Sequence, residues 1–198
     1  MITFADRLNT VEEYYFSKKL REVNLLKSQG KPIINLGIGS PDLEPPSRVI
    51  DAIIESMNDA VAHKYQSYQG LPELREAMVN FYREHYGVSL SPLTEVLPLM
   101  GSKEGIMHIS MAFLNEGDEV LIPNPGYPTY ASVTKLVGAK PVLYDLLEEN
   151  DWCPDLVALQ NSDLSKVKLM WISYPHMPTG ATASNKVLAD SYIGGTKP

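Results

Sequence analysis

Four short apolar runs alternate with helical patterns in the second half of the chain, and this alternation restricts the fold more than any other feature. The runs cover residues 96–100, 119–122, 140–146 and 167–173. Between the first three runs, apolar residues recur at the three- and four-residue spacing of a helix. Strands that alternate with helices favour a mainly parallel sheet. The sequence therefore predicts an α/β domain.

The first half of the chain predicts helices joined by loops. Residues 11–29 predict an N-terminal helix, and residues 33–42 predict an extended piece that runs into a Gly/Pro-rich loop. Ser47 is the expected N-cap of a second helix, because its hydroxyl can accept a backbone N–H. Residues 60–70 have no clear period and predict a loop. Pro72 then opens a further helix at a position where proline is tolerated.

Composition excludes several classes of function. The 198 residues carry a net charge of −7 with no Lys/Arg cluster, so a nucleic-acid partner is not expected. Cys153 is the single cysteine, which excludes an internal disulfide and suits a reducing compartment. Neither a signal peptide nor an apolar run of about 18 residues is present, which predicts a cytoplasmic protein without a membrane span. No histidine has metal-ligand spacing, so no metal is expected.

A glycine–serine corner follows the first apolar run. Gly101, Ser102 and Lys103 stand where that run ends and a helical pattern begins. In parallel α/β sheets ligands bind at the carboxyl ends of strands, and a helix start there offers unpaired N–H groups and partial positive charge. These residues predict an anion site, most often for phosphate. They also fit a tight strand-to-helix turn with a capping serine. The spacing is not that of a Walker loop, and the Gly37–Asp42 stretch lacks the third glycine of a dinucleotide site.

Two more turn-rich loops leave strands at the same predicted sheet edge. The loop after the second run presents Tyr127 and Tyr130, and the fourth run leads into Tyr174-Pro175-His176-Met177. An aromatic side chain beside a phosphate site suits a flat phosphorylated ring, because stacking orients the ring. Alternatively, the two tyrosines only cover the sheet edge.

In this order and spacing, the stretches resemble the N-terminal half of the class I/II aminotransferases, which are fold-type-I enzymes dependent on pyridoxal 5'-phosphate (PLP). The resemblance covers roughly residues 30–182. The matching stretches are Asn35–Asp42, Tyr65–Ala77, Gly101–Glu104, Gly117–Val120, Pro125–Pro128 and Pro178–Gly180.

The resemblance implies a three-layer α/β sandwich with a mainly parallel sheet. This is the large domain of the aspartate aminotransferase-like PLP-dependent transferases, here incomplete. Residues 1–45 are then an N-terminal helix and substrate-side loop that form part of a small domain. Residues 46–183 are a partial PLP-binding large domain, and residues 184–198 are a short tail in place of the second half.

The resemblance also implies roles for single residues. Backbone amides of Gly101–Lys103 would hold the cofactor phosphate, and Tyr127 would stack on the pyridine ring. Gly39 would lie near the substrate carboxylate. Tyr65 would reach the phosphate of the neighbouring subunit, because family members are homodimers with shared active sites. The implied reaction transfers an amino group between an amino acid and a 2-oxo acid.

One departure from the family pattern concerns the cofactor ring. The asparagine that usually precedes Pro-Thr-Gly, and that hydrogen-bonds the ring hydroxyl, is replaced by Met177. A methionine sulfur is a weak acceptor and no donor. His176, one residue earlier, is therefore the candidate for a substitute cofactor contact.

A second departure follows Ala181. The family segments with the aspartate for the pyridine nitrogen, the Schiff-base lysine and the substrate-binding arginine have no counterpart here, so no catalytic residue is assigned. We expect the chain alone to be inactive, with its 96–100 strand unpaired and prone to association. Two alternatives remain open. One is a non-catalytic PLP- or phosphate-binding or dimerisation module, and the other is an unrelated α/β domain that binds a nucleotide or sugar phosphate.

Overall fold

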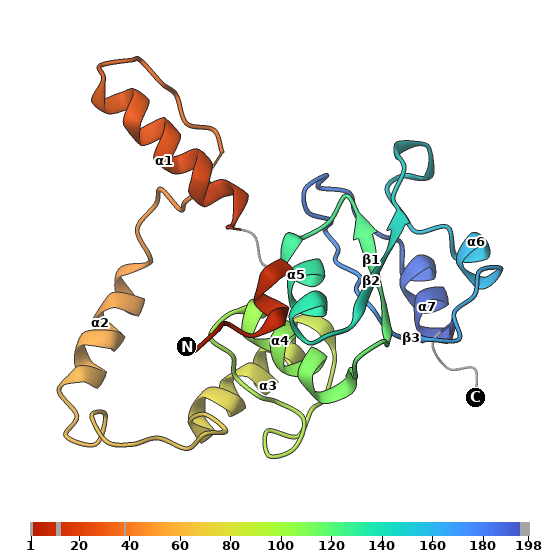
Figure 1. The fold of residues 1–198 in the computed structure, drawn as a ribbon. Helices are drawn as coiled ribbons and strands as arrows, with labels where there is room; N and C mark the ends of the chain where they lie inside the picture. Colours follow the sequence, from red (N-terminus) through yellow and green to blue (C-terminus); the bar gives the residue numbers. More distant parts are fainter. Residues whose placement is uncertain (1, 11–12, 38, 195–198) are drawn as a thin grey trace. The chain divides into compact units, whose positions relative to one another are not determined.

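The computed structural model describes residues 2–10, 13–37 and 39–194 (Figure 1). They form two compact units. One is Glu13–Pro98, and the other comprises the described residues of Leu99–Pro198 and Met1–Glu12. The domain boundaries expected at residues 45 and 183 stay predictions.

The Glu13–Pro98 unit contains three helices, α1 (Tyr15–Ser28), α2 (Ser47–Met57) and α3 (Pro72–Tyr86). Pro72 lies in the first turn of α3, as predicted, and Gly87 ends that helix in the left-handed conformation with φ 67°. The predicted N-cap of α2 is wrong by one residue. Pro46 takes the extended N-cap conformation, with φ −53° and ψ 138°, so Ser47 is already helical.

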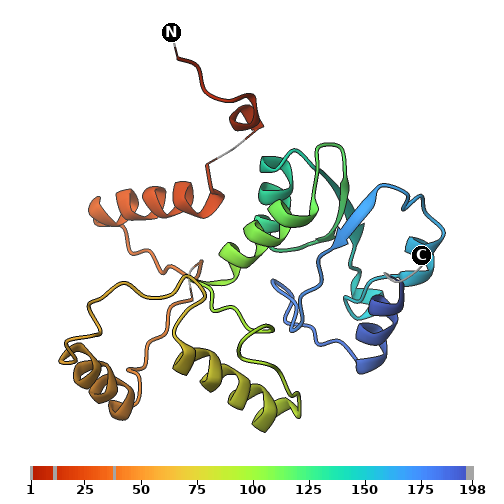
Figure 2. The same cartoon turned by 90° about the horizontal axis from the view of Figure 1, so that it is seen from below.

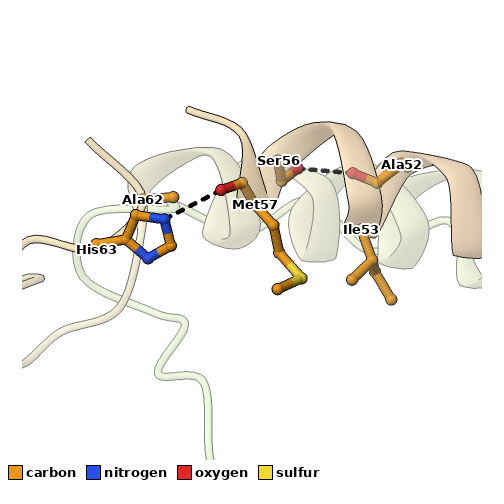
Figure 3. A pocket seen from close by; sticks show the side chains of 6 residues that line it. All are labelled: Ala52, Ile53, Ser56, Met57, Ala62 and His63. Atoms are coloured by element: carbon orange, nitrogen blue, oxygen red, sulfur yellow. Dashed lines mark hydrogen bonds between the residues drawn. The ribbon is translucent and has the colours of Figure 1, made fainter. Parts of the chain in front are cut away.

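The apolar side of α2 borders an open pocket of about 440 Å³ (Figure 3). Its lining residues are Ala52, Ile53, Ser56, Met57, Ala62 and His63. The His63 Nε2 atom lies 3.0 Å from the Met57 carbonyl oxygen, and Ser56 Oγ donates to the Ala52 carbonyl at 2.8 Å. These contacts satisfy carbonyl groups near the end of α2 but leave its isoleucine side chains exposed.

The second unit is built on a three-stranded parallel sheet. Its strands are β1 (Glu119–Asn124), β2 (Lys140–Asp145) and β3 (Val167–Met170), in the order β2-β1-β3. In register, Leu121 of β1 pairs with Val142 on one side and Met170 on the other. These strands confirm three of the four apolar runs.

Helices cover both faces of this sheet, and β1 is therefore buried on both sides. Val120 and Ile122 pack into a cluster with α4 (Ser102–Phe113) and α5 (Pro128–Leu136). Leu121 packs into the opposite cluster, on the side of α6 (Leu156–Gln160) and α7 (Asn185–Gly194). Figures 1 and 2 show the two helical layers on either side of the strands. The short 3-10 helix η1 (Asp6–Thr10) contacts α5, and η2 (Glu148–Asn150) follows β2. The predicted α/β sandwich is confirmed.

The strand predicted over residues 96–100 is wrong. In the described parts of the chain no strand forms there, and Leu97 and Met100 are exposed. A strand requires a neighbouring strand for its backbone groups, and the described residues 96–100 pair with none of β1, β2 and β3. None of the described helices combines the length and apolar character needed to cross a membrane.

Candidate functional site

The start of α4 is shaped by Gly101. Its φ of 94° and ψ of 161° fall in a region that is essentially restricted to glycine. The Glu104 carboxylate reaches back and accepts the Met100 N–H at 2.5 Å, which fastens the chain just before the helix. Ser102 and Lys103 are the first helical residues, whose N–H groups have no acceptor within a helix. The corner therefore presents backbone donors and the positive end of the helix dipole.

Tyr127 lies next to this corner, at the N-cap of α5. The Lys103 Nζ atom is 5.6 Å from the centroid of the Tyr127 ring, which is within cation–π range. The Tyr127 ring also makes an edge contact with Tyr130, at 5.7 Å between centroids. Tyr130 in turn stacks on Trp171 at 5.1 Å with an interplanar angle of 8°. Tyr127 thus packs against the buried Tyr130, which is itself stacked on Trp171.

Ser102 of the corner and the Tyr127 ring both line a cavity of about 600 Å³. The volume lies within the usual range of small-molecule sites. The described residues that line it are Leu99, Ser102, Gly105, Ile106, Ile109, Tyr127, Tyr130, Trp171, Ile172, Ser173 and Met177. They provide aromatic surface, aliphatic surface and two serine hydroxyls, and they include no charged side chain.

His176 joins two loops at the carboxyl ends of the strands. Its side chain is buried, with 3% of its surface exposed. The Nε2 atom lies 3.1 Å from the Pro125 carbonyl oxygen, and Nδ1 lies 2.8 Å from Thr179 Oγ1. Because a carbonyl only accepts, Nε2 carries the proton of this bond. His176 therefore connects the loop after β3 to the loop that leads into Tyr127. A direct contact of His176 with a cofactor stays a prediction.

Further hydrogen bonds order the same sheet edge. Asn124 Nδ2 donates to Asp145 Oδ1 at 2.8 Å, which ties the ends of β1 and β2. The Tyr144 hydroxyl donates to the Trp171 carbonyl at 2.6 Å, and the Tyr174 hydroxyl donates to the Trp152 carbonyl at 2.7 Å. Burial raises the pKa of Tyr144 well above its ordinary value. Burial, followed by the nearby Cys153, raises the pKa of Tyr174 to about 12. Both phenols are therefore neutral donors at neutral pH.

The structure brings together four of the predicted site residues, Gly101, Ser102, Lys103 and Tyr127, and it connects His176 to them through the Pro125 loop. Tyr65 and Gly39 lie in the Glu13–Pro98 unit, both in exposed segments, and their roles stay predictions. Within the described ranges no group of three or more His, Cys, Asp or Glu side chains is arranged to hold a metal ion.

Sequence reasoning missed the roles of Glu104 and Thr179. Glu104 stands three residues after the helix N-cap, which is the acidic position of a capping box. That spacing was a readable signal for a side chain that reaches back to the preceding backbone. The Thr179 hydroxyl is used by both His176 and the Ala181 N–H, at 2.8 and 3.3 Å. No spacing rule pointed to that bond, because it depends on how the turn folds.

Ser102 at the start of α4 and the Tyr127 ring thus border one cavity in the unit that contains the parallel sheet. The family model of aminotransferase class I and II matches residues 31–190. The chain belongs to this family, whose members depend on PLP.

Relatives of known name agree with this assignment. The chain is 41% identical over 179 residues to the LL-diaminopimelate aminotransferase of Halothermothrix orenii, covering 90% of this chain and 46% of that protein. It is 40% identical over 181 residues to the enzyme of the same name from Aquifex aeolicus, covering 91% of this chain and 47% of that protein. The chain therefore spans about half the length of the relatives it matches.

Solved structures likewise match nearly all of this chain over about half of their own length. BacF from Bacillus subtilis matches with a TM-score of 0.90 and 36% identity, over 98% of this chain and 49% of that one. An alanine aminotransferase from Pyrococcus furiosus matches with a TM-score of 0.88 and 32% identity, also over 98% of this chain and 49% of that one. The similarity thus extends over nearly all of this chain.

Proposed function

We propose that this chain forms the phosphate- and ring-binding half of the active site of a PLP-dependent aminotransferase. The reaction is the transfer of an amino group between an amino acid and a 2-oxo acid. The observation that carries the proposal is the cavity that Ser102, in the first turn of α4, and the Tyr127 ring both border, with Lys103 Nζ 5.6 Å from the centroid of that ring. The fit is chemical as well as spatial, since a helix N-terminus suits a phosphate and a tyrosine suits a flat heteroaromatic ring.

In this proposal the backbone N–H groups of Ser102 and Lys103 donate to the phosphate oxygens, and the helix dipole adds favourable potential. Gly101 permits the close approach, and Glu104 accepts the preceding Met100 N–H and so orders the chain before the helix. Bound PLP supplies an electron sink for chemistry at the α-carbon of the amino acid. The ring is kept flat against Tyr127, whose own position depends on its edge contact with Tyr130.

His176 acts in this site as a positioning residue. Its Nε2–H holds the Pro125 carbonyl, two residues before Tyr127. Met177, with 49% of its surface exposed, lines the cavity and presents a thioether that cannot donate to a ring hydroxyl. The chain therefore offers the ring mainly stacking and apolar contact.

The remaining family roles concern assembly and location. We propose a homodimer in which Tyr65 reaches the cofactor phosphate of the neighbouring subunit and Gly39 lies near the substrate carboxylate. The full exposure of Tyr65 supports such an intersubunit contact. The single cysteine, Cys153, is free, which supports a cytoplasmic protein.

The substrate proposal rests on the relatives. At 40–41% identity over the shared half, those named LL-diaminopimelate aminotransferase make that diamino acid the first donor to test. The test uses a full-length member of the family that carries these residues, with amino transfer to a 2-oxo acid as the readout. Absence of transfer from several amino acids would favour the alternative of a non-catalytic phosphate-binding module.

The cofactor half-site is tested with 4'-deoxypyridoxine 5'-phosphate, which lacks the aldehyde and so reports non-covalent binding alone. Calorimetry of the 198-residue chain should show saturable binding that Gly101→Ala and Tyr127→Leu weaken by about tenfold or more. Tyr127→Phe should retain most of the affinity, because phenylalanine keeps the stacking face. Tyr68→Leu, at an exposed tyrosine, is the control. Equal affinity in the Tyr127→Leu and Tyr127→Phe variants would contradict the stacking role.

A further inference from the structure

The side chain of a buried arginine in the Glu13–Pro98 unit has no hydrogen-bond or ion-pair partner among the described residues. Arg75 lies on α3 and exposes 6% of its surface. Its Nε atom is fully buried without a hydrogen-bond acceptor. Among the described residues, Arg75 also forms no ion pair. A guanidinium group stays charged at any physiological pH, so this side chain is a buried cation with open donor capacity.

The arginine borders a small pocket of about 330 Å³. The other lining residues are Gln69, Leu93, Thr94, Glu95, Val96 and Leu97. All of them belong to the Glu13–Pro98 unit, whereas the proposed phosphate corner belongs to the other unit. Gln69 and Thr94 add an amide and a hydroxyl, which are suitable secondary donors for an anion.

Glu95 is the one acidic side chain in this lining, and it is already engaged. Its Oε2 atom accepts the Ser91 N–H at 2.7 Å, which closes the turn before residue 96. No ion pair joins Glu95 to Arg75 in the described part of the chain. The carboxylate therefore orders the wall of the pocket and does not neutralise the arginine.

The other arginine of α3, Arg83, has a different environment. Arg83 is exposed on α3, and its Nη2 donates to Asn80 Oδ1 at 2.9 Å. Water can solvate such a group at no structural cost, whereas a desolvated guanidinium is stable only with an ionised or hydrogen-bonding partner. The planar fork of arginine matches the two oxygens of a carboxylate or a phosphate.

We propose that the Arg75 pocket binds an oxoanion, with the guanidinium as the principal ligand and Gln69 and Thr94 as secondary donors. A free phosphate and a carboxylate on a protein side chain share this chemistry, and the pocket volume admits either. The proposal does not depend on the aminotransferase assignment, because it concerns another unit of the chain.

The test is an NMR titration of the 198-residue chain, observed at the Arg75 Nε–H signal. The signal is assigned by its loss in Arg75→Lys. Inorganic phosphate and acetate are added separately, with sodium chloride at matched ionic strength as the reference. We expect a saturable shift of the Arg75 signal with at least one oxoanion and none with chloride, while the Arg83 signal stays in place. A shift with phosphate alone indicates that the ligand of the pocket is a free phosphate. A shift with acetate indicates that the ligand is a carboxylate.

Two variants complete the test. Arg75→Gln should weaken the oxoanion response of the Gln69 and Thr94 amides by about tenfold or more, because a charge-assisted bond is lost. Arg83→Gln, on the same helix, should leave it unchanged. The proposal would be overturned if the Arg75 Nε–H signal shifted with neither oxoanion, or if chloride shifted it equally. The titration itself is run on the unsubstituted chain, and the Arg75→Lys variant that assigns the signal keeps the positive charge, so the result decides the matter even where Arg75→Gln fails to fold.

Discussion

Replacement of His176 tests the link between the two loops at the sheet edge. His176→Ala removes the bonds to Pro125 and Thr179 and opens a small cavity in a buried position. Each net hydrogen bond contributes about 1 kcal/mol, and the lost packing with an unsatisfied carbonyl adds about 1 kcal/mol more. We therefore expect the free energy of unfolding to fall by about 3 kcal/mol. In a domain of this size, that lowers Tm by roughly 6–12 °C.

Two conservative variants separate the two bonds. Glutamine places its amide near the position of Nε2 and can still donate to the Pro125 carbonyl, whereas asparagine can replace only the Nδ1 acceptor. His176→Gln should therefore lose about 1 kcal/mol and retain affinity for 4'-deoxypyridoxine 5'-phosphate. His176→Asn should lose more stability and bind the ligand more weakly, because the loop before Tyr127 is released.

The assay is urea denaturation followed by tryptophan fluorescence, to which Trp152 and Trp171 of the same unit both contribute, with Trp171 stacked on Tyr130. His108→Ala is the control. His108 is 63% exposed on α4 and contacts Glu104 only at 3.6 Å, so its loss should change stability by no more than about 0.5 kcal/mol. If His176→Ala matches that control, or if glutamine and asparagine are equivalent, the reasoning about the inter-loop bond is refuted.

Three further predictions follow from backbone conformation, burial and the cavity lining. Gly101→Ala should lower the free energy of unfolding by about 1–3 kcal/mol, because φ is 94°, although no atom lies within 4 Å of the added Cβ. Gly105→Ala should be tolerated, because the atom 2.6 Å from its added Cβ is only the end of the flexible Leu99 side chain. Thermal denaturation of the two variants measures this difference. Stability should fall as pH rises from about 10 to about 12, because the unfolded phenol of Tyr174 ionises near its ordinary pKa while the folded one, with its pKa raised to about 12, keeps its proton. Tyr174→Phe should flatten that part of the curve in urea titrations, and an unchanged slope would contradict the assignment. The purified 198-residue chain should show negligible amino transfer, because the described residues that line its cavity include no charged side chain to move a proton. Turnover above the rate of free PLP would show this to be wrong.

Periodicity predicted the sheet well where strands are buried on both faces. β1 reads as a continuous apolar run because Val120 and Leu121 enter opposite clusters, and this makes it visible in the sequence. The run at 96–100 has the same composition but no neighbouring strand. Composition can identify a potential strand, whereas a strand also requires a partner for its backbone groups. That is why this one element was predicted and is absent.

The candidate site was predictable to the extent that it depends on backbone features. Gly101 and the helix after it follow from a glycine at the end of an apolar run, and Tyr127 follows from its place before Pro128. The roles of His176 and Arg75 were not readable, because they depend on burial. A histidine in a loop has no spacing that shows both ring nitrogens bonded across two loops. An arginine in a helix has no pattern that shows it lacks an acceptor.

The residues that line the cavity suit cofactor binding and not proton transfer. The described residues around the cavity supply backbone donors, aromatic surface and hydroxyls, but no group that takes up and returns a proton near neutral pH. Substitutions here should therefore change affinity for the cofactor and leave the pH dependence of turnover in a complete enzyme unaltered. His176 is not expected to transfer protons either, because its two ring nitrogens are already hydrogen-bonded to Pro125 and Thr179. A complete enzyme in which His176→Gln shifted the pH–rate profile at saturating cofactor would instead place that imidazole in proton transfer.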